Sequence, residues 1–175
     1  MTININPGRA LVLATDGACL FNPGPGGWAV IINEVDYGDA VVSRSALAGR
    51  ADGDTTNNQM ELQATIEALR YASGKAYTAV TIVSDSQYVV KGATEWLPGW
   101  KARGWRTSGR KPVLNRDLWE TLDALAADLP VTWQWTRGHV GHPMNELADR
   151  IANDAAAGLH SGEPEELRRM YPEAF

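Results

Sequence analysis

Four carboxylates occupy positions at which secondary structure can bring them together. Asp16 directly follows a first apolar segment, and Asp85 directly follows a later one. Glu61 lies near the start of a segment with helical periodicity, and Asp149 lies within the last such segment. If the two apolar segments form parallel neighbouring strands, Asp16 and Asp85 lie at the same edge of a sheet, which is where open α/β sheets bind ligands.

A cluster of this kind favours binding of a hard divalent cation. Burying the carboxylates without a partner would cost several kcal/mol or raise their pKa values. Mg²⁺ removes that problem, because it prefers oxygen ligands and retains waters for a substrate phosphate. Two such ions about 3.5–4 Å apart can activate a water molecule and stabilise the leaving oxygen of a phosphodiester. A closed zinc site is not expected, because Cys19 is the single cysteine and His139 and His142 are too few.

Taken singly, each carboxylate also has an ordinary structural explanation. A strand-end aspartate such as Asp85 often forms a turn or caps a helix. The helix dipole favours a first-turn glutamate such as Glu61, and Asp149 has Arg150 beside it as a partner. The functional interpretation therefore depends on the four occurring together with a basic, aromatic-rich region elsewhere in the chain.

That basic region lies between Trp96 and Arg116. The net charge of −5 argues weakly against a nucleic-acid partner, but the charge is unevenly distributed. No acidic residue occurs in this stretch, and three of the seven tryptophans do. Its basic residues and tryptophans are Lys101, Arg103, Arg106, Arg110, Lys111, Arg116, Trp96, Trp100 and Trp105.

Hydrophobic periodicity and turn residues predict the element order β-β-β-α-β-α-α-β-α. This order is typical of an α/β fold with a five-stranded mixed sheet, in which three antiparallel strands are followed by parallel ones and helices flank the sheet. The predicted strands are residues 10–15, 27–33, 39–47, 80–84 and 131–136, and the predicted helices are 57–72, 86–96, 116–127 and 143–157.

The composition indicates an ordinary globular chain of one domain. Its length is 175 residues, with 44% hydrophobic and 21% charged residues. No apolar run approaches the roughly 18–20 residues of a membrane span, and the first ten residues lack the layout of a secretory signal. The single Cys19 suits a reducing compartment. We therefore expect a cytoplasmic monomer that does not bind membranes.

Four sequence blocks resemble type 1 ribonuclease H, most closely its bacterial single-domain form. They are TDGAC with NPGPGG (15–19 and 22–27), TTNNQMEL (55–62), SDSQYV (84–89), and GHVGHP (138–143) with Asn145, Glu146 and Asp149. The blocks occur in the family's order from about Leu11 to Ala156. The resemblance implies a ribonuclease H-like fold with a basic protrusion and a catalytic domain at residues 1–157. It leaves a C-terminal tail at 158–175, which we expect to be weakly ordered or an appended arm.

The resemblance also implies an activity. Members of this family hydrolyse the RNA strand of RNA–DNA hybrids with two Mg²⁺ ions, for which Mn²⁺ can substitute, and leave 5′-phosphate and 3′-hydroxyl ends. Carried over, the catalytic metal ligands are Asp16, Glu61, Asp85 and Asp149. His139 matches the family's mobile histidine, whose role is to position water, transfer a proton or assist product departure. His142 is expected to support the loop.

The same resemblance assigns the contacts to the hybrid. The matching residues are Cys19, Asn22, Thr56, Asn57, Asn58, Gln87 and Asn115, with Asn58 and Gln87 in the minor groove and Thr56 and Asn115 at a DNA phosphate. On the protrusion, the contacts are Trp100, Lys101, Arg103 and Trp105. Of the tryptophans there, Trp96 and Trp100 are expected mainly to pack and Trp105 to meet the DNA strand. Two departures, Ala102 between Lys101 and Arg103 and Leu114 where a lysine is frequent, predict weaker or more salt-sensitive binding.

Three other interpretations remain open from the sequence. One is another nuclease of the same fold, such as a transposase, integrase or junction resolvase, which cleavage of duplex DNA would reveal. Another is a hybrid-binding module without activity, which a missing carboxylate would favour. A third is a domain of a larger polymerase. The Met1 start near the first strand and the extra tail lead us to expect a free-standing protein instead.

Overall fold

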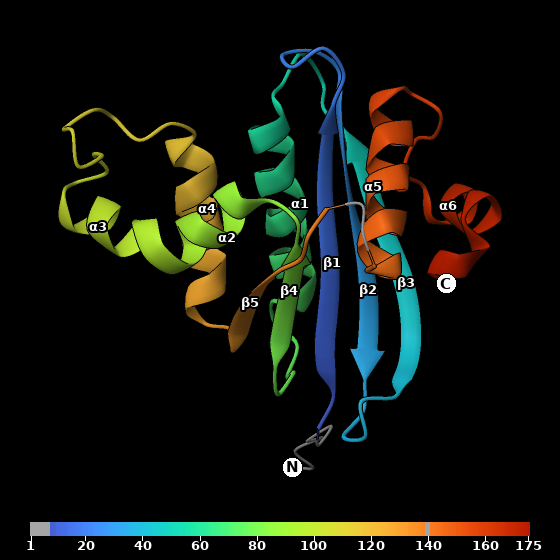
Figure 1. Ribbon diagram of the computed structural model, residues 1–175. Helices are drawn as coiled ribbons and strands as arrows, with labels where there is room; N and C mark the ends of the chain where they lie inside the picture. The colour runs from blue at the N-terminus through green and yellow to red at the C-terminus, as the bar shows by residue number, and fades with distance from the viewer. Residues whose placement is uncertain (1–7, 139–140) are drawn as a thin grey trace.

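The computed structural model describes residues 8–138 and 141–175 and contains the predicted mixed sheet (Figure 1). Its five strands are β1 (Ala10–Cys19), β2 (Gly26–Val35), β3 (Val41–Arg50), β4 (Val80–Ser84) and β5 (Val131–Trp135), in the order β3-β2-β1-β4-β5. The first three pair antiparallel, and β4 and β5 continue the sheet in parallel with β1. The predicted fold class is confirmed.

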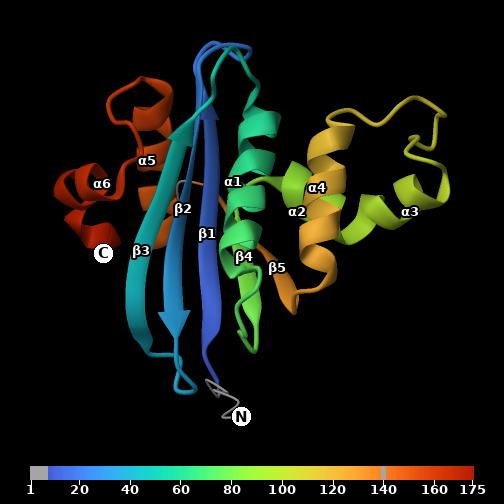
Figure 2. The same ribbon diagram turned by 180° about the vertical axis from the view of Figure 1, so that it is seen from behind.

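Helices cover both faces of the sheet, as the two opposite views show (Figures 1 and 2). The alternation of side chains along β1 divides the core accordingly. Leu11 and Leu13 pack with the α1 side, whereas Ala14 and Ala18 pack with α5. The helices are α1 (Asn57–Ala72), α2 (Gln87–Lys91), α3 (Leu97–Ala102), α4 (Arg116–Ala127), α5 (Pro143–Ala156) and α6 (Pro164–Met170), with a π-helical turn η1 (Gly92–Trp96) and a 3₁₀ turn η2 (Pro172–Ala174). None of the helices in the described residues has the length and apolar character that crossing a membrane requires.

Several predicted boundaries differ from the structure. β1 runs on past Thr15 to Cys19 because Asp16–Cys19 stay paired with β2, so the hairpin ladder overrides the polar sequence. β2 and β3 likewise extend through hairpin pairing, and β3 begins two residues later than predicted. The predicted helix 86–96 is divided into α2 and η1, and helical structure continues past its predicted end as α3. At the start of η1, Gly92 lies against Trp119, where a Cβ would approach the ring to 2.1 Å.

The C-terminal tail is well packed, so the expectation of weak order is wrong. α6 and η2 bury Leu167, Tyr171 and Ala174 in the same cluster as residues of α5 and β2. Only Leu167 lies on α6, since the helix ends at Met170, so the spacing of four and three residues among these apolar positions spans the helix, Tyr171 and η2. This short apolar pattern is the signal that the sequence offers for the packing of the tail.

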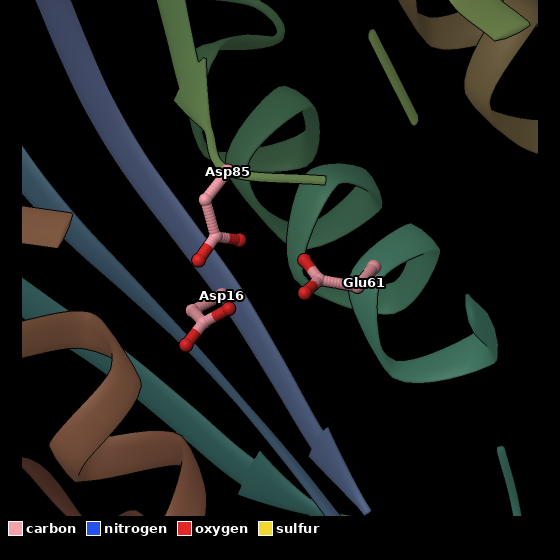
Figure 3. Close-up of side chains that lie close together, drawn as sticks. All are labelled: Asp16, Glu61 and Asp85. Atoms are coloured by element: carbon pink, nitrogen blue, oxygen red, sulfur yellow. The ribbon is translucent and has the colours of Figure 1, made fainter. Parts of the chain in front are cut away.

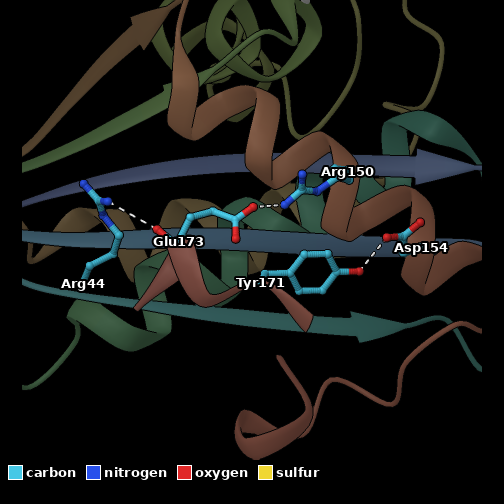
Figure 4. A network of polar contacts seen from close by, with 5 residues as sticks. All are labelled: Arg44, Arg150, Asp154, Tyr171 and Glu173. Atoms are coloured by element: carbon cyan, nitrogen blue, oxygen red, sulfur yellow. Dashed lines mark hydrogen bonds and ion pairs between the residues drawn. The ribbon is translucent and has the colours of Figure 1, made fainter. Parts of the chain in front are cut away.

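Polar contacts also join the tail to the body of the protein (Figure 4). The Tyr171 hydroxyl donates a hydrogen bond of 2.6 Å to Asp154 Oδ2 on α5. The Arg150 guanidinium, also on α5, pairs with the Glu173 carboxylate. Arg44 of β3 donates to the Glu173 carbonyl oxygen at 3.3 Å. The tail therefore links α5 to the edge strand of the sheet.

This packing predicts that the tail contributes to global stability. Leu167→Ala should lower the free energy of unfolding by about 2–4 kcal/mol, because it removes a fully buried side chain and leaves a cavity. Leu159→Ala, in the same tail but 60% exposed, should change it by less than about 0.5 kcal/mol. Urea denaturation of the two variants measures this difference. Equal effects would show that the tail does not belong to the cooperative fold.

Candidate active site

Three carboxylates meet at the carboxyl end of β4 (Figure 3). The parallel pairing of β1 with β4 ends at the pair Thr15 and Ser84, so Asp16 and Asp85 each follow the last paired residue. Glu61 approaches from the first turns of α1. Ligand oxygens of Asp16, Glu61 and Asp85 all lie within 4.8 Å of one another, which suits a metal ion. The predicted meeting of the two strand-end aspartates is confirmed.

The position of Glu61 depends on a close approach of α1 to β1. A capping box starts the helix, since the Thr56 hydroxyl accepts from the Gln59 N–H and the Gln59 side chain accepts from the Thr56 N–H. A Cβ on Gly17 would lie 2.2 Å from the carbonyl carbon of Met60 and 2.3 Å from the backbone nitrogen of Glu61. Only glycine at position 17 therefore lets the helix bring Glu61 beside Asp16.

The backbone at Asp85 is held from both sides. The Ser84 hydroxyl accepts from the Ser86 N–H at 3.1 Å, and the Ser86 hydroxyl caps α2 by accepting from the Val89 N–H. From β5, Trp135 donates its indole N–H to the Asp85 carbonyl oxygen at 3.0 Å. These bonds fix the strand end from which the Asp85 carboxylate projects.

Trp135 and Gly138 are residues that sequence reasoning missed here. On β5, Trp133 packs against the core cluster on the α1 side of the sheet, whereas Trp135 is 44% exposed and donates its indole N–H to Asp85. A Cβ on Gly138 would lie 2.9 Å from Asp85 Oδ2, so glycine leaves room for that carboxylate.

Asp149 lies on α5, outside the group of three carboxylates. Its Oδ1 accepts a 3.0 Å hydrogen bond from Asn153, one turn later. Asn145, buried at the start of α5, donates to the carbonyl oxygen of Thr15 at 3.4 Å, which anchors the helix beside the residue preceding Asp16. Asp149 also contributes to raising the pKa of Asp16, so the two side chains interact.

The loop before α5 carries the two predicted histidines. His142 caps α5, because its Nδ1 accepts from the Asn145 N–H at 3.2 Å. The predicted support of the loop by His142 stays a prediction. His139 lies outside the described residues.

In the absence of a cation, the pKa values of two carboxylates in this cluster lie far above their usual range. Burial, and then repulsion by Glu61 and Asp85, raises the pKa of Asp16 to about 11. Burial also raises the pKa of Glu61 to about 8, although hydrogen bonds with Asp16 and Gly17 act in the opposite direction. Asp16 Oδ2 and Glu61 Oε2 are buried and have no hydrogen-bond partner among the described residues. Buried carboxylate oxygens of this kind fit a hard divalent cation, so the residues present suit the expected metal.

A polar hollow of about 590 Å³ collects many of the predicted substrate contacts. Two hydrogen bonds connect its walls. The Asn57 N–H donates to Asn22 Oδ1 at 3.0 Å, and Gln59 Nε2 donates to Asn115 Oδ1 at 3.2 Å. The residues that line it are Asn22, Thr56, Asn57, Asn58, Leu114 and Asn115. Segments far apart in the chain thus form one neutral, hydrogen-bonding surface.

Two further predicted contacts, Gln87 and Cys19, are not among the residues that line this hollow. Gln87 is exposed at the first position of α2, two residues after Asp85. Cys19 is partly buried, and its Sγ lies 3.2 Å from the Thr55 carbonyl oxygen and 3.5 Å from that of Gly24. The thiol therefore ties the β1–β2 turn to the segment before α1.

The base of the protrusion is an aromatic cluster. Trp100 is only 9% exposed and packs against Trp96 and Trp119, with ring centroids 5.7 and 5.3 Å apart. The predicted packing role of Trp96 and Trp100 is confirmed, and Trp100 has little surface left for a substrate. Trp119, which sequence reasoning did not single out, is fully buried and donates its indole N–H to the Tyr88 hydroxyl at 2.9 Å.

The basic residues of the protrusion differ in their environments. Lys101 Nζ forms an ion pair of 2.9 Å with Asp123 of α4, so part of its charge is offset. Arg103, Arg106 and Arg110 are exposed and line a hollow of about 470 Å³ together with Thr107. Arg103 Nε donates to the Arg106 carbonyl oxygen at 3.1 Å. The arginines, more than Lys101, provide the positive surface.

Comparison with known proteins agrees with this geometry. A family model described as RNase H matches residues 8–157. A ribonuclease H of Treponema pallidum subsp. pallidum is 50% identical over 158 residues, covering 87% of this chain and 94% of the relative. LC9-RNase H1, described as a type 1 RNase H with the type 2 active-site motif, superposes with a TM-score of 0.76 at 32% identity, covering 96% of this chain and 84% of that one.

A more distant structure shares the fold. LC11-RNase H1, crystallised in complex with an RNA/DNA hybrid, has a TM-score of 0.61 at 21% identity, covering 85% of this chain and 98% of that one. The sheet order and the carboxylates at its edge thus define a protein of the ribonuclease H-like class. Within that class, the chain belongs to the ribonuclease H family.

The raised pKa values predict how stability depends on pH without metal. A group whose folded pKa is raised contributes stability below its unfolded pKa, and that stability is lost as the pH rises through the folded value. In EDTA, the wild type should therefore lose stability from about pH 4 to above pH 8 as the cluster ionises. Asp16→Asn should exceed the wild type by about 1.4 kcal/mol or more at pH 8, the equivalent of one pKa unit.

Urea denaturation across this pH range tests the expectation. Added Mg²⁺ should stabilise the wild type and close the gap. Asp52→Asn, which removes an exposed carboxylate, should behave as the wild type does. A wild type that is more stable than Asp16→Asn throughout the range would contradict the account of repulsion.

Proposed function

We propose that this protein is an endonuclease that hydrolyses the RNA strand of RNA–DNA hybrids, leaving 5′-phosphate and 3′-hydroxyl ends. One observation carries the proposal. In a chain of the ribonuclease H family, three carboxylates that repel one another meet at a sheet edge, and a polar hollow of matching family residues accompanies them. The crystallised complex of LC11-RNase H1 with an RNA/DNA hybrid supports the choice of substrate.

We propose Mg²⁺ as the cofactor, two ions per site, with Mn²⁺ able to substitute. Asp16, Glu61 and Asp85 would hold it, and Asp149 would complete the ligand set from α5. The buried, unpartnered oxygens of Asp16 and Glu61 support this assignment. When bound, the metal supplies charge for the reacting phosphodiester and lowers the pKa of water. The carboxylates then remain ionised at neutral pH, because the cation replaces their mutual repulsion with attraction.

The residues of the polar hollow bind and orient the hybrid. Asn58 and Gln87 contact the minor groove, and Thr56 and Asn115 hold a DNA phosphate, with Asn57 beside them. Neutral amides and hydroxyls read sugar, phosphate and shape, so little base preference is expected. The 2′-hydroxyl distinguishes RNA from DNA, and polar neutral groups beside the carboxylates suit its recognition. Cys19 and Asn22 shape the turn that faces the same strand.

The protrusion binds the DNA strand of the hybrid. Arg103, with Arg106 and Arg110 beside it, neutralises phosphates, and the half-buried Trp105 presents its ring from a turn braced by the Arg116 guanidinium 5.7 Å from the ring centroid. Lys101 contributes less, since its ion pair with Asp123 must give way before it meets phosphate. Binding that rests on these few arginines is sensitive to salt.

The remaining assignments concern the loop at residue 139 and the whole chain. His139 positions water, transfers a proton or assists product departure. Residues 1–157 form the catalytic unit, and the tail at 158–175 is an appended arm that packs against it. The protein acts as a monomer in the cytoplasm, without a membrane partner.

A cleavage assay with four matched substrates tests the proposed activity. The RNA strand of an end-labelled RNA–DNA hybrid should be cut in Mg²⁺ and left intact in EDTA. Single-stranded RNA, duplex RNA and duplex DNA of the same sequence should remain uncut. Binding of the hybrid without cleavage would identify an inactive binding module, and cutting of duplex DNA would identify a recombination-type nuclease.

Asp85→Asn tests the metal ligands. The substitution removes one anionic oxygen at nearly constant volume, so the fold should persist while kcat in millimolar Mg²⁺ falls by more than about 100-fold. Residues that merely support a metal ligand already change activity by about 10–100-fold. Hybrid cleavage and circular dichroism give the two readouts, with Asp52→Asn as the matched control. Unchanged turnover would remove Asp85 from the ligand set.

A further inference from the structure

Phe21 combines two unfavourable features that the free protein does not compensate. Its side chain is 91% exposed, at the turn between β1 and β2 (the upper end of β1 in Figure 1). Its backbone has φ of 61°, the left-handed region that a side chain with a Cβ adopts at a cost and that glycine adopts freely. Strained residues cluster at functional sites, so an exposed ring at such a position is a candidate for a role in binding.

The turn around Phe21 is held too firmly for this strain to relax. On one side, the Leu20 N–H donates to the Pro25 carbonyl oxygen at 2.8 Å. On the other, Gly24 and Thr55 exchange two backbone hydrogen bonds of 3.0 and 2.8 Å. The Cys19 thiol donates to the Thr55 carbonyl oxygen, and Asn22 Oδ1 accepts from the Asn57 N–H at the start of α1. The ring is thus displayed from a fixed backbone, and a partner would not have to order the turn.

The position of Phe21 points to the substrate. The next residue, Asn22, lines the polar hollow. Phe21 lies five positions after Asp16, and residues 16–19 are extended strand, so Cys19 lies about 10 Å past Asp16 along β1. The turn that carries Phe21 thus lies beyond the carboxylates along β1, next to the hollow to which the proposed function assigns the flanking nucleotides.

We propose that Phe21 is a substrate-contacting residue whose ring packs against sugar carbons of the bound hybrid, in nucleotides that flank the cleaved phosphate. This inference rests on the proposed function. The wide, shallow minor groove of an A-like duplex presents sugar edges to a protein surface. A protein partner would be met by a contiguous apolar patch. Phe21 instead stands next to the polar Asn22, in a turn tied to Asn57, with exposed Asn58 following.

Phe21→Gly tests the proposal, because it separates binding from stability. Loss of the ring should raise the KM for hybrid cleavage about three- to tenfold, the range for losing part of an aromatic contact area. The Kd for the same fluorescent hybrid in EDTA should rise by a similar factor. The kcat at saturating hybrid should stay within about twofold, since the ring does not touch the reacting atoms. Thermal unfolding should move upward by a few degrees, because glycine relieves the strained φ.

Two further variants control the interpretation. Phe21→Tyr keeps the ring and should retain wild-type KM. Tyr37→Ala removes another exposed ring, 79% exposed and lying against Gly8, from the β2–β3 turn at the other end of the β2 strand, and should change neither KM nor Kd.

The outcomes separate this inference from the proposed function. If the wild type cleaves the hybrid and Phe21→Gly has unchanged KM and Kd, the contact is refuted and the nuclease assignment stands. A Phe21→Gly protein that is less stable than the wild type would show that the ring serves the fold, which also overturns the proposal. If the wild type neither binds nor cleaves the hybrid, the proposed function itself fails, and this inference fails with it.

Discussion

Mutual repulsion among Asp16, Glu61 and Asp85 is the constraint on which the rest of the site depends. Carboxylate oxygens of the three residues lie within 4.8 Å of one another. Burial together with the like charges of neighbouring carboxylates raises the pKa values of Asp16 and Glu61. A fold that holds such a cluster must obtain the required stability elsewhere. Here it comes from two apolar layers, one on each side of the sheet, and from a tail that adds to the α5 layer.

The scaffold brings the cluster together by ending one strand early. β1 continues for four residues beyond its last pair with β4, Thr15–Ser84. The two strands are therefore no longer paired at Asp16 and Asp85, and the edge of the sheet is open there. Glycine at position 17 lets α1 close against β1 at that opening, and Gly138 leaves room for the Asp85 carboxylate. The geometry of the site thus depends on these two glycines, which have no side chain, as much as on the carboxylates themselves.

The sequence predicted the features that have a local signal. The helices at 57–72 and 116–127 have the predicted bounds, because apolar spacing and flanking turn residues define them. The parallel strands implied that Asp16 and Asp85 share an edge. Contacts between distant segments have no such signal, which is why the bond from Trp135 to Asp85 and the burial of Trp119 were not foreseen. The packing of the tail was not predicted, because only three apolar residues form its buried surface.

Tyr88 connects the polar hollow with the protrusion. Its hydroxyl accepts hydrogen bonds from Asn115 at 3.1 Å and from Trp119 at 2.9 Å, and its ring packs against Trp96 at a centroid distance of 6.0 Å. One side chain therefore joins a residue of the hollow to the aromatic base that carries the arginines. These contacts fix how the hollow and the protrusion are placed relative to each other in the structure, so under the proposed function a duplex that meets both must have backbones separated by a matching width. The proposed selection among nucleic acids would then depend on groove dimensions, which differ between duplex types, as well as on the groups that touch the scissile strand.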